Sequence, residues 1–209
     1  MGLLENLQWR YATKKFDNTK KVSEDDITFL KKAISLAATS YGLEAYEVLI
    51  IENQDIKDRL KDASWGQAQV SDASHVFVFC NNTKISNELI DAYMDRKSND
   101  QGIAKENLQG YGDFMKNTLL ALPEDEAAHW TRRQTYIAGG NLMVACAELQ
   151  IDSCPMEGFE AEKYNEILEL DKDGLNACLV VPVGYRSEED NNQHLPKTRK
   201  SLDQMFRHL

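Results

Sequence analysis

Two short segments at opposite ends of the chain concentrate positive charge. Residues 10–16 read RYATKKF, with three cations and an aromatic side chain near each flank, and residues 195–200 read LPKTRK, with three more. Guanidinium groups bind phosphate oxygens through paired hydrogen bonds, so Arg10, Lys197 and Arg199 would form a phosphate site if the fold brings the two ends together. The simpler interpretation of each segment is a solvated surface, and periodicity alone does not choose between them.

Two other segments have polar groups suited to a flat heterocycle. In the loop Cys154–Phe159, Pro155 stiffens the backbone, Gly158 permits unusual dihedral angles, and a carboxylate lies between them. Such a loop can point a backbone N–H at a ligand, although an ordinary helix-to-strand connection has the same composition. Residues 65–69, WGQAQ, present two amides beside a tryptophan, either for a ligand or as an exposed loop.

Hydrophobic periodicity predicts the elements that position these segments. Helical spacing follows an N-cap signature at Ser23, and a second long helix begins near Trp130. The region from about 86 to 122 is polar and predicts one or two helices that project from the core. Continuous apolar runs predict buried strands at residues 46–51, 75–80 and 177–185. Strands separated by helices favour an α/β or α+β sandwich.

The helix that begins near Trp130 is predicted to be buried, because its apolar residues lie on nearly every side. Gly139 and Gly140 in its middle cost about 1 kcal/mol each relative to alanine. A close approach by another backbone would explain them. This helix is therefore the expected spine of the fold or of a dimer.

The composition of the chain argues against several classes of function. The 209 residues, 42% hydrophobic and 28% charged, predict one globular domain spanning 1–209. A net charge of -10 argues against binding to nucleic acid or to an anionic membrane. There is no secretory signal or bilayer-spanning apolar run, and the four scattered cysteines indicate reduced thiols in a cytoplasm. The histidines lack metal-ligand spacing, so we expect no structural metal, and no dinucleotide-binding glycine motif, P-loop or hydrolase triad is present.

The ordered segments together resemble one known family, the FMN-dependent nitroreductases, nearly end to end. The matching segments are RYATKKF at 10–16, Thr39-Ser40, DASHVFVF at 72–79, Gln134, PMEGF at 155–159, VVPVG at 180–184 and LPKTR at 195–199. The resemblance implies an α+β fold, a nitroreductase-like α/β sandwich with a mixed central sheet flanked by helices. It also implies an interlocked homodimer with FMN bound in the interface. NADH or NADPH would reduce the flavin, which would then reduce nitroaromatics, quinones or related flat acceptors.

The resemblance also assigns roles to residues. Lys14 and Glu157 would be catalytic, Lys14 as the cation at the N1 and O2 edge of the flavin and Glu157 through its backbone at N5. Thr39 and Ser40 would come from the second subunit, and Tyr41 and Tyr111 would line the substrate pocket. The residues implied in cofactor binding are Arg10, Tyr11, Ala12, Lys14, Thr39, Ser40, Gly42, Gln69, Gln134, Pro155, Met156, Glu157, Gly158, Lys197 and Arg199.

Four positions depart from the pattern typical of the family. Ala12 and Gly42 stand where serine and asparagine are frequent, Gly66 replaces a side chain that commonly bonds the flavin, and Gln69 replaces a lysine found in some members. A glutamine there weakens the positive field and could lower the flavin potential. The alternatives are an FMN carrier or sensor that NAD(P)H does not reduce, a dihydropteridine-type reductase on the same scaffold, or a plain acidic interaction domain.

Overall fold

The computed structural model of the chain describes residues 2–209. It contains the three predicted strands and the predicted long helices, although the helix expected from Trp130 already begins at Glu124, and β3, α4 and α9 were not predicted. The α-helices are α1 (Leu3–Trp9), α2 (Glu24–Ser35), α3 (Gln54–Asp62), α4 (Gln69–Asp72), α5 (Asn87–Gln101), α6 (Lys105–Leu119), α7 (Glu124–Glu148), α8 (Ala161–Leu168) and α9 (Leu202–Met205). The strands are β1 (Tyr46–Ile51), β2 (His75–Asn82), β3 (Asp152–Ser153) and β4 (Leu175–Gly184). Three short 3-10 helices, η1 (Ser40–Gly42), η2 (Leu170–Asp173) and η3 (Asn191–His194), complete the elements.

The strands form one sheet in the order β1-β2-β4-β3, and every neighbouring pair is antiparallel. This confirms the α+β class, but the expectation of a mixed sheet was wrong for residues 2–209. Their one parallel contact is an isolated bridge between Ala12 and Ser153. The order of segments along a chain does not determine strand direction, so the sequence pattern alone could not distinguish the two arrangements.

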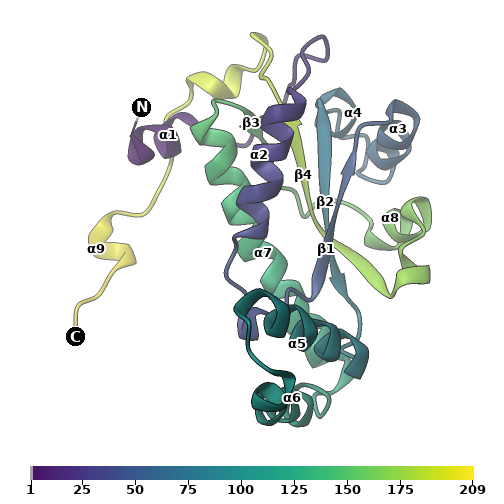
Figure 1. The fold of residues 1–209 in the computed structure, drawn as a ribbon. Coiled ribbons are helices and arrows are strands. Elements are labelled where there is room, and N and C mark those ends of the chain that lie inside the picture. The colour runs from purple at the N-terminus through teal and green to yellow at the C-terminus, as the bar shows by residue number, and fades with distance from the viewer. Residues whose placement is uncertain (1) are drawn as a thin grey trace.

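Helices cover both faces of the sheet (Figure 1). On one face, α2 and α7 bury Leu30, Leu142 and Cys146 against Phe77 and Phe79 of β2. The other face packs against α3, α4 and α8, whose largest buried side chain, Tyr164, bonds Ser64. The central strand β2 is almost entirely buried, as its apolar run predicted. The predicted N-cap of α2 is also present, because the Ser23 side chain accepts a hydrogen bond from the Asp26 N–H.

Helix α7 crosses the sheet, and other residues of the chain cover only one side of this helix. An added Cβ at Gly139 would lie 2.5 Å from Leu179 Cδ2, so this glycine permits close packing against a side chain of β4. An added Cβ at Gly140 would meet nothing within 4 Å. Ile137 and Val144 are 47% and 40% exposed. The prediction of a helix buried on all sides was therefore wrong for the single chain, because the side carrying these residues faces outward.

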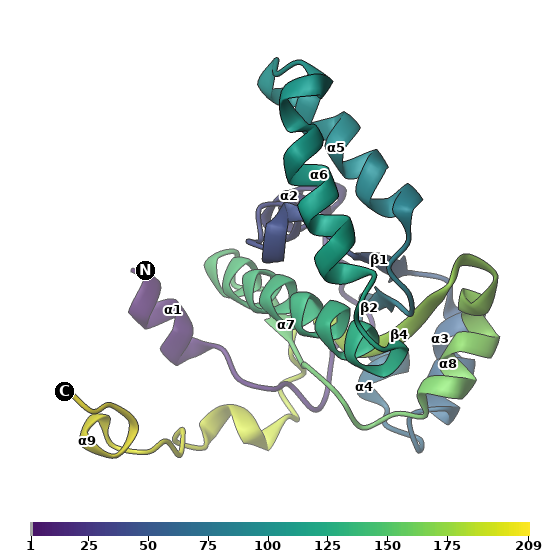
Figure 2. The same ribbon diagram turned by 90° about the horizontal axis from the view of Figure 1, so that it is seen from below.

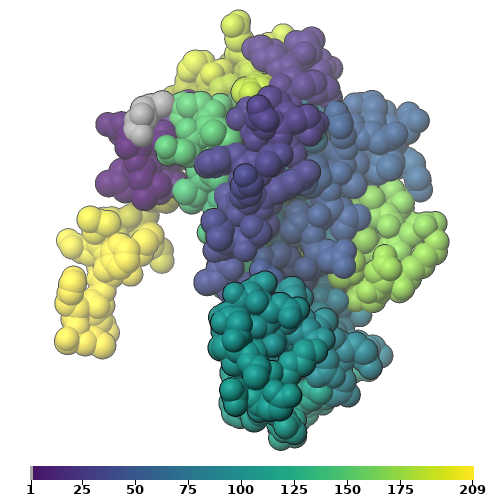
Figure 3. Space-filling view, viewed as in Figure 1, coloured from purple at the N-terminus to yellow at the C-terminus, as the bar shows by residue number. Residues whose placement is uncertain are grey.

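Two parts of the chain extend from the layered body. Helices α5 and α6 pair with each other and project from it (Figure 2), at the position of the predicted helical excursion. The tail that carries α9 lies apart from the other elements (Figure 3). Its Leu202, Met205 and Phe206 are 74%, 54% and 61% exposed. Among residues 2–209, no helix has both the length and the apolar character needed to cross a membrane.

Candidate functional site

Asp190 fixes the backbone of the N-terminal cationic segment. One of its carboxylate oxygens accepts hydrogen bonds from the Lys14 N–H at 2.7 Å, the Lys15 N–H at 3.1 Å and the Tyr11 hydroxyl at 3.0 Å. Burial alone would raise the pKa of this buried carboxyl, but hydrogen bonds from Lys14, Lys15 and Asn192 hold the pKa below its ordinary value. Burial and Asp190 also raise the pKa of Tyr11 above its usual range. The segment is thus held by an ionised carboxylate.

A second buried carboxylate, Asp152 of β3, holds the same segment from the other side. It accepts a hydrogen bond from the Thr13 hydroxyl at 3.2 Å and pairs with Arg186, whose Nε lies 2.9 and 3.0 Å from the two carboxylate oxygens. The Arg186 guanidinium in turn lies between two rings, 4.2 Å from the centroid of Trp9 and 4.6 Å from that of Tyr11. The Arg186 side chain therefore stabilises the fold through these contacts.

The structure brings the two cationic ends of the chain together. Burial first, and then the charge of Arg199, lowers the pKa of Arg10. Burial, Arg10 and Arg199 likewise lower the pKa of Lys197, which donates a hydrogen bond to the Gln8 carbonyl at 2.7 Å. None of these three cations forms an ion pair with a carboxylate of residues 2–209, and the buried Arg10 Nε lacks a partner there. Such a cluster is complementary to a phosphate.

The loop after β3 lies beside the cationic segment. The Lys14 ammonium lies 3.8 Å from Cys154 Sγ, and Met156 exchanges backbone hydrogen bonds with Val180 of β4. Beyond Met156 the pairing stops, and neither the Glu157 N–H nor the Gly158 N–H has a hydrogen-bond partner among residues 2–209. Two adjacent N–H groups without a partner in the described residues can bind an electron-rich edge of a ligand.

Residues 65–69 support this loop from outside. The Gln67 amide donates to the Gly158 carbonyl at 2.7 Å, and Gln69 donates to Gln67 at 2.9 Å. An added Cβ at Gly158 would lie 3.2 Å from the Trp65 ring, which is 65% exposed. The predicted pair of amides therefore works as a chain of hydrogen bonds that positions the loop.

The Glu157 side chain contacts α7. Its carboxylate accepts a hydrogen bond from the Tyr136 hydroxyl, and the hydroxyl oxygen also lies 3.2 Å from the Cys178 carbonyl oxygen. Arg132, Arg133 and His129 complete a surface hollow around this pair. The contact anchors the loop on α7, so the Glu157 side chain has a positioning role in this arrangement.

The remaining predicted site residues form a separate group around η1. The Ser40 N–H donates to the Gln134 side chain at 2.8 Å, and the Tyr111 hydroxyl donates to the Tyr41 carbonyl at 3.4 Å. Tyr41 has a left-handed φ of 61°, which costs about 1–3 kcal/mol for a residue with a side chain. Its ring centroid lies 6.2 Å from those of both Phe114 and Trp130, so this group presents an aromatic surface. Thr39 and Gly42 flank Ser40 and Tyr41 along the chain.

Helix α7 separates the two groups within one chain. Gln134 belongs to the η1 group, whereas Tyr136, two residues later, contacts the loop of the cationic group. Two residues correspond to about 200° around a helix, so the two side chains leave α7 on opposite sides. The first group contains Arg10, Tyr11, Ala12, Lys14, Gln69, Pro155, Met156, Glu157, Gly158, Lys197 and Arg199. The second contains Thr39, Ser40, Tyr41, Gly42, Tyr111 and Gln134.

Sequence reasoning missed the residues that support the first group. Asp152 follows a helix and Asp190 lies in an acidic loop, where carboxylates are common and usually solvated. Tyr136 belongs to the predicted central helix, where the sequence pattern indicates only one of its many apolar side chains. One signal was available for Asp152. It is a carboxylate at a strand, and no cation lies close to it in the sequence. The partners of Asp190 in the N-terminal segment are 175 or more residues away along the chain, so no local pattern indicates them.

We predict that Asp190→Asn lowers the free energy of unfolding by about 1.5–3 kcal/mol at pH 7, the range for hydrogen bonds to a charged group. The folded pKa of Asp190 is depressed, so its contribution is complete above the unfolded value of about 3.9 and disappears as the pH falls through the folded value. Urea unfolding at pH 7 and pH 3 measures both effects, and the variant should approach wild type at the lower pH. Glu189→Gln, an exposed neighbour, is the control and should change little. An equal loss in both variants would contradict the assigned role.

Comparison with known proteins identifies the family and the fold of the chain. The profile of the nitroreductase family matches residues 7–185. The chain is 32% identical to YfkO of Bacillus subtilis over 98% of this chain and 96% of that protein. It is 30% identical to the major NAD(P)H-flavin oxidoreductase of Aliivibrio fischeri over 98% and 97%. A protein of Exiguobacterium sibiricum crystallised with FMN has the same fold, with a TM-score of 0.85 at 17% identity over 100% and 98% of the two chains. The chain therefore belongs to the nitroreductase family of oxidoreductases.

Proposed function

We propose that the chain binds FMN and transfers reducing equivalents from NADH or NADPH to flat acceptors such as nitroaromatics or quinones. The observation that carries this proposal is the meeting of Arg10, Lys197 and Arg199 without a carboxylate partner among residues 2–209. The unpaired Arg10 Nε and the free N–H groups of Glu157 and Gly158 suit a ligand with a phosphate and a heteroaromatic ring.

Each part of the first group has a distinct role in this proposal. The three cations bind the phosphate, and the Glu157 and Gly158 N–H groups orient the ring. When bound, FMN supplies a ring that accepts a hydride from NAD(P)H and donates it to the acceptor. Lys14 stabilises the negative charge that develops during this transfer, since a fixed cation in a preorganised site costs no reorganisation at the moment of reaction. Asp190 keeps Lys14 in place through its backbone.

A homodimer completes the proposed site. Because α7 separates the two groups of one chain, the first group of one subunit would meet the η1 group of the other. The outward-facing Ile137 and Val144 and the exposed tail residue Phe206 provide apolar surface for such an interface. In this arrangement Tyr41 and Tyr111 bring their aromatic surface to the partner's cofactor, where a flat acceptor can stack on it.

The first test is the visible spectrum of the purified protein before and after anaerobic addition of NADH and then NADPH. We expect a flavin spectrum that bleaches with one or both donors, and slower bleaching in Lys14→Ala because the developing charge loses its stabilising cation. Lys15→Ala, an exposed neighbour, serves as control. A flavin that neither donor bleaches would support a carrier or sensor. A colourless protein that does not take up FMN would reject the proposal.

The phosphate assignment predicts unequal effects of two neighbouring cations. Arg199→Ala should weaken FMN retention roughly tenfold to hundredfold, the equivalent of losing about 1.5–3 kcal/mol from a charge-assisted contact. Lys200→Ala removes the same charge from the exposed tail and should change retention less than twofold. Equilibrium dialysis of the stripped proteins against FMN provides the dissociation constants. Similar constants in both variants would mean that the tail contributes only its net charge.

The dimer proposal predicts that Ile137→Glu lowers both the mass in solution and FMN retention. A buried carboxylate without a partner is strongly unfavourable in an interface, so the two groups would no longer meet. Phe29→Glu changes an equally exposed apolar residue (45%) on α2, which carries no predicted site residue, and should leave both properties unchanged. Light scattering and dialysis measure the two quantities. A monomeric Ile137→Glu protein that keeps FMN would show that one chain forms a complete site.

A further inference from the structure

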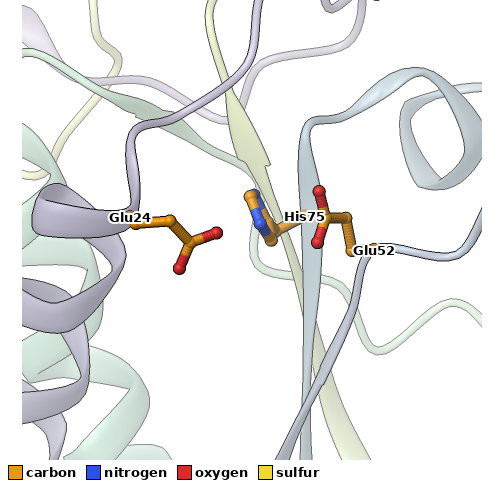
Figure 4. A group of neighbouring side chains, drawn as sticks. All are labelled: Glu24, Glu52 and His75. Atoms are coloured by element: carbon orange, nitrogen blue, oxygen red, sulfur yellow. The ribbon is translucent and has the colours of Figure 1, made fainter.

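Three potential metal ligands meet at one end of the sheet, and none of them is among the residues assigned to the cofactor. Glu24 is the first residue of α2, Glu52 follows β1 directly, and His75 begins β2. One ligand atom from each residue lies within 4.8 Å of the ligand atoms of the other two. Figure 4 shows the imidazole of His75 between the two carboxylates.

The backbone holds these residues together. In the antiparallel pairing of β1 and β2, Ile51 lies opposite Val76, so the next residues outward, Glu52 and His75, are neighbours across the strands. The Ser74 hydroxyl accepts a hydrogen bond from the Val22 N–H at 2.9 Å, which ties the start of α2 to β2. The three ligand positions therefore come from elements with fixed relative placement.

His75 has the environment of a ligand. Its side chain is only 4% exposed, and its Nδ1 lies 2.9 Å from the Ser74 hydroxyl. Its Nε2 forms no hydrogen bond with residues 2–209, so this nitrogen is available to a ligand. Histidines that bind a metal through one ring nitrogen usually place the other in a hydrogen bond, as Ser74 allows here.

The two carboxylates are not committed elsewhere. Neither Glu24 nor Glu52 forms an ion pair with a cation of residues 2–209. The nearby ammonium group of Lys57 is buried and donates to the Ala73 carbonyl at 2.7 Å, while Lys21 is exposed. The two exposed carboxylates lie near the buried imidazole of His75. A cation bound by all three side chains would reduce the repulsion between the two carboxylates.

We propose that Glu24, Glu52 and His75 bind a divalent transition-metal cation, with Zn²⁺ as the best match, and that water completes its coordination. Zinc binds carboxylate oxygen and imidazole nitrogen at about 2.0–2.2 Å, so tetrahedral ligands lie about 3.4 Å apart. The present separations, all within 4.8 Å, exceed this value by about 1.4 Å at most, and the exposed glutamate side chains can close that difference. One nitrogen ligand favours zinc over magnesium or calcium, which prefer oxygen alone.

Such an ion would fasten α2 to the ends of β1 and β2. This end of the sheet also borders the N-terminal segment, because an added Cβ at Gly184 would lie 3.0 Å from the Ser74 backbone N and 3.1 Å from Phe16. The ion has a structural role in this arrangement and no part in the flavin chemistry. Its effect is therefore measurable on FMN-loaded and FMN-free protein alike.

The test uses full-length protein without an affinity tag, stripped of metal with a chelator and dialysed against buffered Zn²⁺. Wild type should bind one equivalent and show a higher thermal midpoint with Zn²⁺. Glu24→Gln and Glu52→Gln each remove one ligand from an exposed position and should weaken binding at least tenfold. Asp25→Asn removes a carboxylate from the same helical turn outside the cluster, so it should bind like wild type.

Two results would overturn the proposal. Equal Zn²⁺ affinity in wild type, Glu24→Gln and Glu52→Gln would place the ion elsewhere on the protein. An equal rise of the thermal midpoint with Mg²⁺ would show general attraction of cations to an acidic surface, without the contribution of His75. The absorption bands of Co²⁺ added in place of Zn²⁺ provide a second readout, because a nitrogen ligand alters these bands. The Asp25→Asn variant should show the same Co²⁺ bands as wild type.

Discussion

The position of α7 constrains the whole molecule. One side of this 25-residue helix packs on the sheet, and Gly139 lets it approach Leu179 closely. The same helix holds Ser40 through Gln134 and the loop at Glu157 through Tyr136. Both groups of candidate residues are thus positioned by one rigid element. In the single chain, the two groups therefore lie on opposite sides of α7.

Much of the fold was predictable because it depends on local patterns. The strands at residues 46–51, 75–80 and 177–185 follow from apolar runs, and the start of α2 follows from its cap at Ser23. Strand direction was not predictable, since it depends on how connections return in space. The outward-facing side of α7 was also missed, because an apolar pattern does not distinguish burial within a chain from burial against another.

The candidate site was predictable where residue types are distinctive and not where they are common. Arg10 and Lys197 are conspicuous cations in an acidic protein, and the structure places them together. The carboxylates that hold the N-terminal segment, Asp152 and Asp190, are two among many acidic residues, and distant partners give them their roles. The cluster of Glu24, Glu52 and His75 escaped sequence reasoning for the same reason, since no spacing along the chain indicates it.

The separation of the two groups by α7 has a genetic consequence in the proposed dimer. Each site would combine Arg10 and Lys14 of one chain with Ser40 and Tyr41 of the other. A chain damaged in the first group and a chain damaged in the second would then assemble into a mixed dimer with one intact site and one doubly damaged site. Two inactive alleles could therefore complement each other, although neither chain alone encodes a working protein.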